Sequence, residues 1–208
     1  MTLNHPILEQ SFAVIDREIG AHNFTPAEYA IVRRVIHSTA DFEFQHLLHF
    51  SPGAIEVAIS ALSAKTPIIT DVNMVAQGIV SLAQKTFGNP VIAAIDRALV
   101  SLPGQTRSES GLLACWQEQP QAIYVIGNAP TALLSLCERI AATAVQPPLV
   151  IGAPVGFISV IESKAALAQT SVPQIRVEGR KGGSPVAAAI VNALLVLAWE
   201  QRHSARSN

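Results

Sequence analysis

The stretch that decides the fold is IYVIGNAPTALLSLCERIAA, residues 123–142. Its first four residues are all apolar, which is typical of a strand that helices cover on both faces. Gly127 and Pro130 then predict a tight turn that leads directly into a helix. A strand followed at once by a helix is half of a βαβ unit, so this stretch predicts a parallel sheet.

The same order of short apolar run and helical pattern recurs from Thr66 onward. It predicts a single α/β domain over residues 1–201, with a mostly parallel sheet of about five strands flanked by helices. Residues 202–208 predict a polar C-terminal tail. The expected strands are 67–70, 91–95, 123–126, 149–151 and 174–177, and the expected helices are 72–82, 108–117, 131–142, 160–168 and 185–199.

The first sixty-odd residues show helical spacing of their apolar side chains instead, and predict a helical N-terminal segment. Helices are expected over 6–20, from Pro26 to near His37, and from Ser51 to near Ala64. Thr25, Pro26 and Glu28 form a helix start with a capping pattern. The stretch 38–50 is expected to be irregular.

The composition excludes several classes of protein. Half of the 208 residues are hydrophobic (50%) and 14% are charged, against roughly 25% charged in an average soluble domain. A chain this apolar is not intrinsically disordered. The net charge of -1 and the 5% of aromatic residues argue against nucleic-acid binding, because they provide neither a basic field nor an aromatic stacking platform.

The high hydrophobicity raises the question of a membrane span. The charge-free stretch 140–161 is long enough, but prolines and glycines break it, and the stretch 182–199 leaves only 185–199 as a continuous helix. The N-terminus lacks the basic and apolar regions of a signal peptide. Cys115 and Cys137 are isolated, with neither a C-x-x-C motif nor a zinc-ligand spacing. We therefore expect a cytoplasmic protein with no membrane partner.

Three glycine-rich loops follow expected strands, at 127–130, 152–156 and 179–185. In a parallel sheet these loops share the edge at the carboxyl ends of the strands, where ligands bind. Each loop leads into a helix start, whose N–H groups and dipole favour an anion, although ordinary tight turns have the same pattern. None of the loops matches a dinucleotide or P-loop motif.

Charged residues occur where this edge would meet an anion. Arg180 and Lys181 lie on the loop 179–185, and Arg107 opens an expected helix, where a cation is poorly placed for stability. Each is therefore either a solvated charge or a ligand for an anionic group. Asp71, at the end of the first expected strand, is expected to cap the helix that follows it.

His37 is the strongest single candidate for chemistry, and it lies at an expected helix end. The helix C-terminus favours the imidazolium form and Arg33 opposes it, so the direction of the pKa shift of His37 stays open. Asp41 would orient the ring if the helix continued that far. His46 and His49 lie three apart, but no Cys, Asp or Glu completes a ligand set at a useful spacing, so no metal site is expected.

Six motifs resemble the precorrin-8X methylmutase family of corrin biosynthesis, in the family's order and over nearly the whole chain. Ser11-Phe12 at the N-terminus also matches, and the fourth and fifth motifs are specific. The motifs are R-x-V-I-H-S-T-A-D-F (33–42), P-I-I-T-D-V-x-M-V-x-x-G (67–78), G-x-T-R-S (104–108), G-N-A-P-T-A-L (127–133), G-x-P-V-G-F-x-x-x-x-E-S-K (152–164) and G-R-x-G-G-S (179–184).

The resemblance implies a cofactor-free isomerase that forms a homodimer with a parallel α/β fold. Members of the family move a methyl group from C-11 to C-12 of the macrocycle in a 1,5-sigmatropic shift, which gives hydrogenobyrinate, or cobyrinate in the cobalt-first route. His37 maps onto the histidine that donates or accepts a proton near ring C, Ser11 onto a substrate-contacting serine, and Arg107 onto the motif arginine. The implied substrate, a tetrapyrrole polycarboxylate, also suits residues in or beside the motifs, namely Thr39, Asn128, Arg180, Lys181 and Ser184.

The resemblance leans toward one branch of the family, shows one departure from its pattern, and leaves two alternatives. The stretch HSTADFEF, residues 37–44, is more similar to cobalt-first members, and Gln10 stands where some members have arginine. A non-catalytic tetrapyrrole-binding protein would use the same cleft. A nucleotide- or phosphate-binding α/β enzyme is the other alternative, and the lack of a dinucleotide fingerprint disfavours it.

Overall fold

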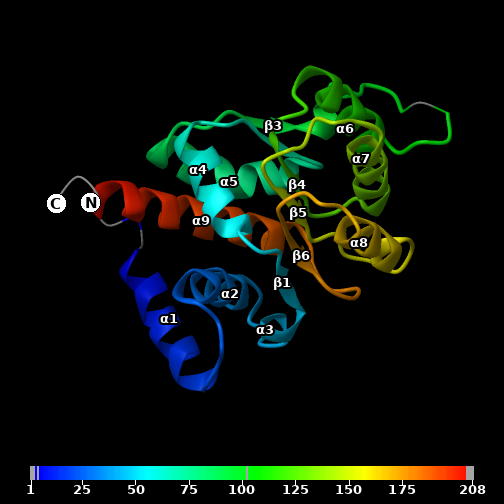
Figure 1. The fold of residues 1–208 in the computed structure, drawn as a ribbon. Coiled ribbons are helices and arrows are strands. Elements are labelled where there is room, and N and C mark those ends of the chain that lie inside the picture. The colour runs from blue at the N-terminus through cyan, green and yellow to red at the C-terminus, as the bar shows by residue number, and fades with distance from the viewer. Residues whose placement is uncertain (1–2, 4, 102, 205–208) are drawn as a thin grey trace.

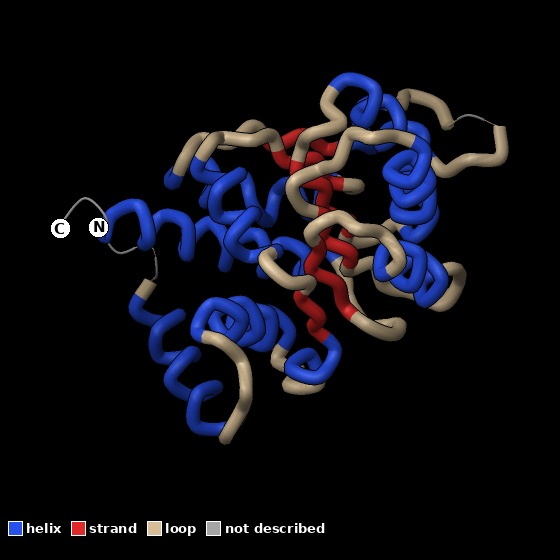
Figure 2. The backbone as a smooth tube through the Cα atoms, viewed as in Figure 1, coloured by secondary structure: helices blue, strands red, loops and turns tan. Residues whose placement is uncertain are grey.

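A six-stranded sheet forms the centre of the computed structural model, which describes residues 3, 5–101 and 103–204 (Figure 2). Five strands run parallel in the order β6-β5-β4-β2-β3, and β1 pairs with β6 in the antiparallel sense. This confirms the expected α/β domain with a mostly parallel sheet. The strands are β1 (Leu48–Phe50), β2 (Ile68–Thr70), β3 (Val91–Ala93), β4 (Ile123–Ile126), β5 (Val150–Gly152) and β6 (Gln174–Val177).

Helices cover both faces of the sheet, and each face has its own hydrophobic core (Figure 1). One face packs against α2 (Pro26–Thr39), α4 (Ala54–Ser63), α5 (Asn73–Thr86) and α9 (Ser184–Ser204). The opposite face packs against α6 (Arg107–Glu118), α7 (Pro130–Ala142) and α8 (Val160–Ala168). The first helix, α1 (Pro6–Glu18), packs on α2, and the short α3 (Phe44–Leu47) precedes β1.

The two cores explain why β4 is apolar throughout. In β4, Ile123 and Val125 belong to the core under α9, whereas Tyr124 and Ile126 belong to the core under α7. All four side chains are buried because successive residues of a strand point to opposite faces. The parallel strands therefore bring the loops after β2, β3, β4, β5 and β6 to one edge of the sheet.

The last helix, α9, is the centre of the larger core (Figure 1). It is long and apolar enough to cross a membrane by length and composition, but 67% of its most apolar window is buried inside the protein. It packs closely against α5, where Asn192 Nδ2 donates a hydrogen bond to the Gly78 carbonyl at 2.9 Å. A Cβ on Gly78 would lie 2.8 Å from the Ala188 Cβ, so a larger residue there would push the helices apart.

Several elements differ from the sequence expectation. The stretch 38–50 is not irregular: it contains α3 and β1, which forms only by pairing with β6. The third strand ends at Ala93, where a short 3-10 helix, η1 (Ala94–Arg97), begins. The final helix continues through Ser204, into the segment expected to be a tail, and residues 205–208 lie outside the described part of the chain.

Candidate active site

The first two helices bring Ser11 and His37 together. Ser11 Oγ lies 2.7 Å from His37 Nδ1, and the Phe12 ring contacts the imidazole edge-on with centroids 5.8 Å apart. The start of α2 is fixed by a capping box between Thr25 and Glu28, which confirms the predicted helix start. His37 lies in the last turn of α2 and is exposed, so its other ring nitrogen remains available to a ligand.

Burial and, to a smaller extent, the Arg34 guanidinium lower the pKa of the His37 imidazole below 6.5. The sequence pointed to Arg33 as the opposing cation, but Arg33 forms an ion pair with Asp16 at 3.0 Å on the neighbouring helix. The expectation that Asp41 orients the ring also fails, because α2 ends at Thr39 and Ala40 turns into the left-handed region at φ 53°. Ser11 holds the ring instead.

The end of α2 is tied to the loop between β6 and α9. Lys181 Nζ lies 2.6 Å from Asp41 Oδ2 and 2.5 Å from Glu43 Oε2. The Lys181 ammonium lowers the pKa of the Asp41 carboxyl, and hydrogen bonds to both acids raise the pKa of Lys181. The Thr39 hydroxyl donates to the Val35 carbonyl at 2.9 Å. The two ion pairs of Lys181 connect the segment that follows the His37 helix to the glycine-rich loop, whereas the Thr39 bond lies within α2.

Asp71 does not cap the helix that follows it. Its buried carboxylate instead accepts hydrogen bonds from the backbone N–H groups of Gly127, Asn128 and Ala129, at 3.0, 2.7 and 2.7 Å. Burial raises the pKa of this carboxyl and the three N–H donors oppose the rise. The N-terminus of α7, which the sequence offered as an anion site, is therefore occupied by the protein's own carboxylate, while the Asn128 side chain stays exposed.

The loops after β5 and β6 pack against each other. Gly183 N–H donates to the Ala153 carbonyl at 2.8 Å, and Gly156 N–H donates to the Arg180 carbonyl at 3.3 Å. Gly182 has φ 155°, and a Cβ there would lie 2.4 Å from the Ala153 oxygen, so only glycine allows this approach. The packing leaves Arg180 exposed and buries Ser184, the first residue of α9.

Arg107 binds the backbone near the end of β3. Its Nε donates to the Ala98 carbonyl and its Nη2 donates to the Ile95 carbonyl, each at 3.3 Å. The side chain is nevertheless exposed. The strand β3 lies at the opposite end of the strand order from β1 and β6, so Arg107 binds at a different part of the sheet edge from the loop after β6.

Large apolar side chains are exposed in the loops at the carboxyl ends of the strands. Leu99, in the loop after η1, is 91% exposed, and Phe157, in the loop after β5, is 87% exposed. The loop after η1 extends away from the body of the protein (Figure 2). The Arg180 guanidinium lies over the Phe157 ring at 5.8 Å, which places a cation next to an apolar surface. Val100, Val155 and Ile158 are also exposed in these loops, and Met74 is exposed in the first turn of α5.

Among the described residues, no group of three or more His, Cys, Asp or Glu side chains could hold a metal ion. His46 and His49 line a cavity of about 460 Å³ beside β1, together with His22. Sequence reasoning missed two features near the sheet edge: the reach of Asp71 to another loop, and the burial of Lys164 on α8. Lys164 could have been found, because it shares a helix face with Val160 and Leu167.

Comparison with known proteins places this arrangement in context. The family model described as precorrin-8X methylmutase matches residues 6–197. A cobalt-precorrin-8 methylmutase of Synechocystis sp. is 57% identical over 96% of this chain and 98% of that protein. A precorrin-8X methylmutase of Sinorhizobium sp. is 39% identical over 90% of this chain and 92% of that protein. The structure of a precorrin-8X methylmutase from Thermus thermophilus matches with a TM-score of 0.88 and 41% identity, covering 94% of this chain and 96% of that one.

Proposed function

The chain belongs to the precorrin-8X methylmutase family, and on that premise we propose that it catalyses the C-11 to C-12 methyl shift on cobalt-precorrin-8. It is an isomerase of corrin biosynthesis. The choice of the cobalt-containing substrate is supported by the 57% identity to the cobalt-precorrin-8 methylmutase of Synechocystis sp., which extends over nearly the full length of both chains. The relatives named for the metal-free substrate are less similar, at 39% and 41% identity. Cobalt enters this proposal as part of the substrate.

We propose that His37 transfers the proton that accompanies the methyl shift. In the free protein its lowered pKa keeps the imidazole largely neutral at neutral pH. A bound polycarboxylate adds negative charge and raises that pKa, so the imidazolium forms when substrate is present. His37 then donates a proton near ring C and takes it back after the methyl group has moved, which leaves the protein unchanged. The Ser11 hydroxyl holds Nδ1, so Nε2 is the nitrogen that faces substrate.

The remaining binding residues are proposed as ligands for the carboxylates of the macrocycle. Arg180 is the best supported, because it is exposed and lies beside the apolar Phe157. In the free protein the Lys181 ammonium forms ion pairs with the carboxylates of Asp41 and Glu43. Arg107, Asn128, Thr39, Ser184 and Ser11 complete the proposed set.

The proposed reaction depends on positioning and one proton transfer, so it calls for no cofactor. A sigmatropic shift moves electrons within the substrate itself and needs no nucleophile from the protein. Exposed apolar side chains at the start of α5 and in the loops after η1 and β5 would cover the faces of a large macrocycle. Local cations must attract the substrate, because the net charge of -1 provides no overall attraction for a polyanion.

We also propose that the protein is a homodimer in the cytoplasm. Leu99, Val100 and Phe157 leave apolar surface uncovered on the single chain, which supports burial against a second copy. Light scattering on the purified protein should give twice the chain mass. A monomer at micromolar concentration would contradict this part of the proposal.

The deciding experiment is anaerobic incubation of the protein with cobalt-precorrin-8 and, separately, with precorrin-8X, followed by absorbance spectra. Conversion of the cobalt form to cobyrinate at the higher kcat/KM supports the proposal. A spectral shift from binding without any product would favour the tetrapyrrole carrier. A thermal shift with ATP or NAD and none with a corrinoid would favour the nucleotide enzyme.

A further inference from the structure

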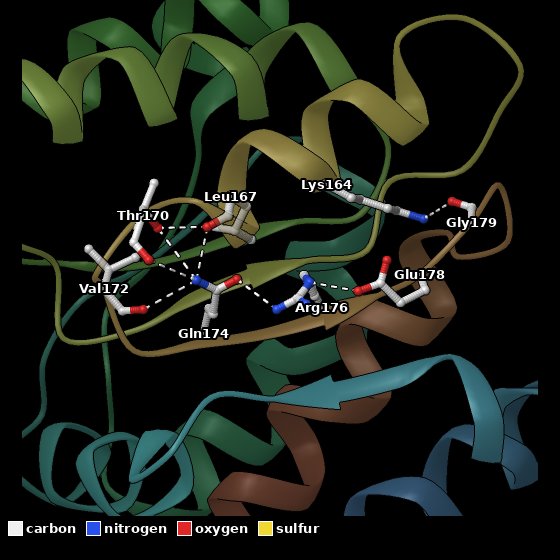
Figure 3. A network of polar contacts seen from close by, with 8 residues as sticks. All are labelled: Lys164, Leu167, Thr170, Val172, Gln174, Arg176, Glu178 and Gly179. Atoms are coloured by element: carbon white, nitrogen blue, oxygen red, sulfur yellow. Dashed lines mark hydrogen bonds and ion pairs between the residues drawn. The ribbon is translucent and has the colours of Figure 1, made fainter.

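Lys164 on α8 is a lysine in the interior of the protein. Its residue is 1% exposed, although lysine is among the residues most rarely buried. The ammonium Nζ donates hydrogen bonds to the carbonyl oxygens of Gly179 at 2.8 Å and Lys181 at 2.7 Å. Figure 3 shows the side chain reaching from α8 across to the loop after β6. The lysine therefore binds main-chain atoms and not a side chain.

This position is costly for a charged group. Burial lowers the pKa of Lys164 to about 8, and the nearby Glu178 carboxylate only partly opposes the shift. Val160 and Leu167 on the same helix face are apolar and fully buried. An apolar side chain at 164 would fill the same space without that penalty. What a lysine adds at this position is therefore its pair of hydrogen bonds to the two loop carbonyls.

The bound carbonyls lie on either side of Arg180. Gly179 precedes it with φ 69°, and Gly182 and Gly183 follow with φ 155° and 119°. A loop this rich in glycine has many accessible conformations unless something fixes its backbone. Lys164 holds the carbonyl before and the carbonyl after Arg180, so it limits where that guanidinium can point.

The same loop is held from its other side. Lys181 forms ion pairs with Asp41 and Glu43, next to the end of the helix that carries His37. On strand β6, Arg176 donates to Glu178 Oε1 at 2.8 Å and to Gln174 Oε1 at 3.1 Å, which holds the strand that leads into the loop (Figure 3). Of these contacts, Lys164 alone binds the loop main chain on both sides of Arg180.

We propose that Lys164 is a positioning residue for substrate binding, which holds the Gly179–Ser184 loop so that Arg180 meets a carboxylate of the substrate. The inference rests on the proposed function, because it takes this loop as part of the tetrapyrrole site. Lys164 itself does not touch the substrate. Its loss should therefore weaken binding far more than it slows the chemical step.

The test compares Lys164→Met with Lys164→Arg and with Lys85→Met, a matched control at an exposed lysine on α5. We expect Lys164→Met to raise KM for cobalt-precorrin-8 about tenfold, with kcat within about threefold of the unmodified protein. Lys164→Arg should restore KM to within about threefold, because a guanidinium also donates to two carbonyls. Lys85→Met should leave both constants unchanged.

A double variant separates positioning from general damage. Arg180→Gln should also raise KM, and adding Lys164→Met to it should raise KM by less than about twofold more, because both changes remove one interaction. Independent, multiplicative effects of the two changes would overturn the proposal. So would a fall in kcat that follows the folded fraction, with KM unchanged. If Lys164→Met does not fold, Lys164→Gln replaces it in every comparison.

Hydrogen exchange provides a readout that does not depend on turnover. In Lys164→Met, the amides of residues 179–183 should exchange at least about tenfold faster, while those of β4 keep their rates. Unchanged exchange in the loop would overturn the proposal even if KM rose. Loop exchange that accelerates in a protein inactive on both corrin precursors would contradict the proposed function and leave the positioning role of Lys164 supported.

Discussion

The hydroxyl of Ser11 lies 2.7 Å from Nδ1 of His37, although the two residues are 26 positions apart in the sequence. The contact exists because α1 packs along α2 with Phe12 buried between them. It fixes which ring nitrogen is available, while burial and, to a smaller extent, Arg34 lower the pKa of the ring. The geometry and the acidity of His37 thus have separate sources, which single substitutions can separate.

Substitution of His37 by alanine should stop the methyl shift without stopping binding. We expect kcat to fall by about 10²–10⁴, the usual contribution of general acid–base catalysis by one side chain. Cobyrinate should still bind, which its absorbance spectrum reports after gel filtration with the protein. His49→Ala, at an exposed histidine on β1, is the control and should keep full activity. Turnover that survives His37→Ala would remove His37 from the mechanism.

The pH dependence should differ between the free protein and its complex with substrate. The profile of kcat/KM reports the free protein, so its apparent pKa for His37 should lie below 6.5. The profile of kcat reports the complex, where substrate carboxylates should raise that pKa.

Arg34→Gln removes the cation that lowers the pKa of His37, so the proton NMR titration of His37 should move to higher pH. Arg17→Gln changes the same charge on the exposed side of α1 and serves as the control. A titration that stays in place in Arg34→Gln would show that burial alone determines the shift.

Asp71→Asn should destabilise the fold strongly. The substitution replaces a fully buried carboxylate, which accepts three backbone N–H groups, by an amide that places its own donors against them. Loss of charge-assisted hydrogen bonds in the interior predicts roughly 2–4 kcal/mol less free energy of unfolding. Urea denaturation measures it. Asp96→Asn, at an exposed acid on η1, should change the stability by less than about 0.5 kcal/mol.

Lys164 should make stability depend on pH in the alkaline range. Its pKa of about 8 in the folded protein lies below the ordinary 10.5, so between these values the unfolded chain binds more protons. The free energy of unfolding contributed by this group therefore rises as pH rises from about 8 to 10.5, by roughly 3 kcal/mol at most. The difference between the unmodified protein and Lys164→Met, followed by urea denaturation, should show this rise. The difference for Lys85→Met should stay flat.

The sequence alone was sufficient to predict the helices and strands whose own residues show a continuous hydrophobic pattern. The strands of the parallel sheet were predicted within about two residues because the two cores favour apolar side chains at most of their positions, with Gln174 and Arg176 on β6 as polar exceptions. The strand β1 has no such signal: its three residues Leu48, His49 and Phe50 become a strand only because the edge of β6 offers hydrogen bonds.

The sequence predicted which residues belong to the candidate site better than it predicted which residues they contact. His37 was singled out by position and by resemblance, but the choice between Arg33 and Arg34 as its neighbour depends on how α1 packs, since Asp16 takes Arg33. Asp71 was noticed at the end of its strand, yet its partner loop is 56 residues away in the sequence. No local pattern encodes contacts of that range, because they arise only when parallel strands align.

The carboxylate that fills the start of α7 has a consequence for selectivity inside a cell. Sheets of this kind ordinarily receive phosphate groups at a helix start in the middle of the carboxyl edge. In this protein the helix start is occupied by the protein's own Asp71 side chain, which already accepts hydrogen bonds from the N–H groups at positions 127–129. A phosphate group of a nucleotide or a sugar phosphate would find these three backbone N–H groups already hydrogen-bonded. These three N–H groups are therefore not available to an external anion, and the exposed cations Arg107 and Arg180 lie on other segments, at the start of α6 and in the loop after β6.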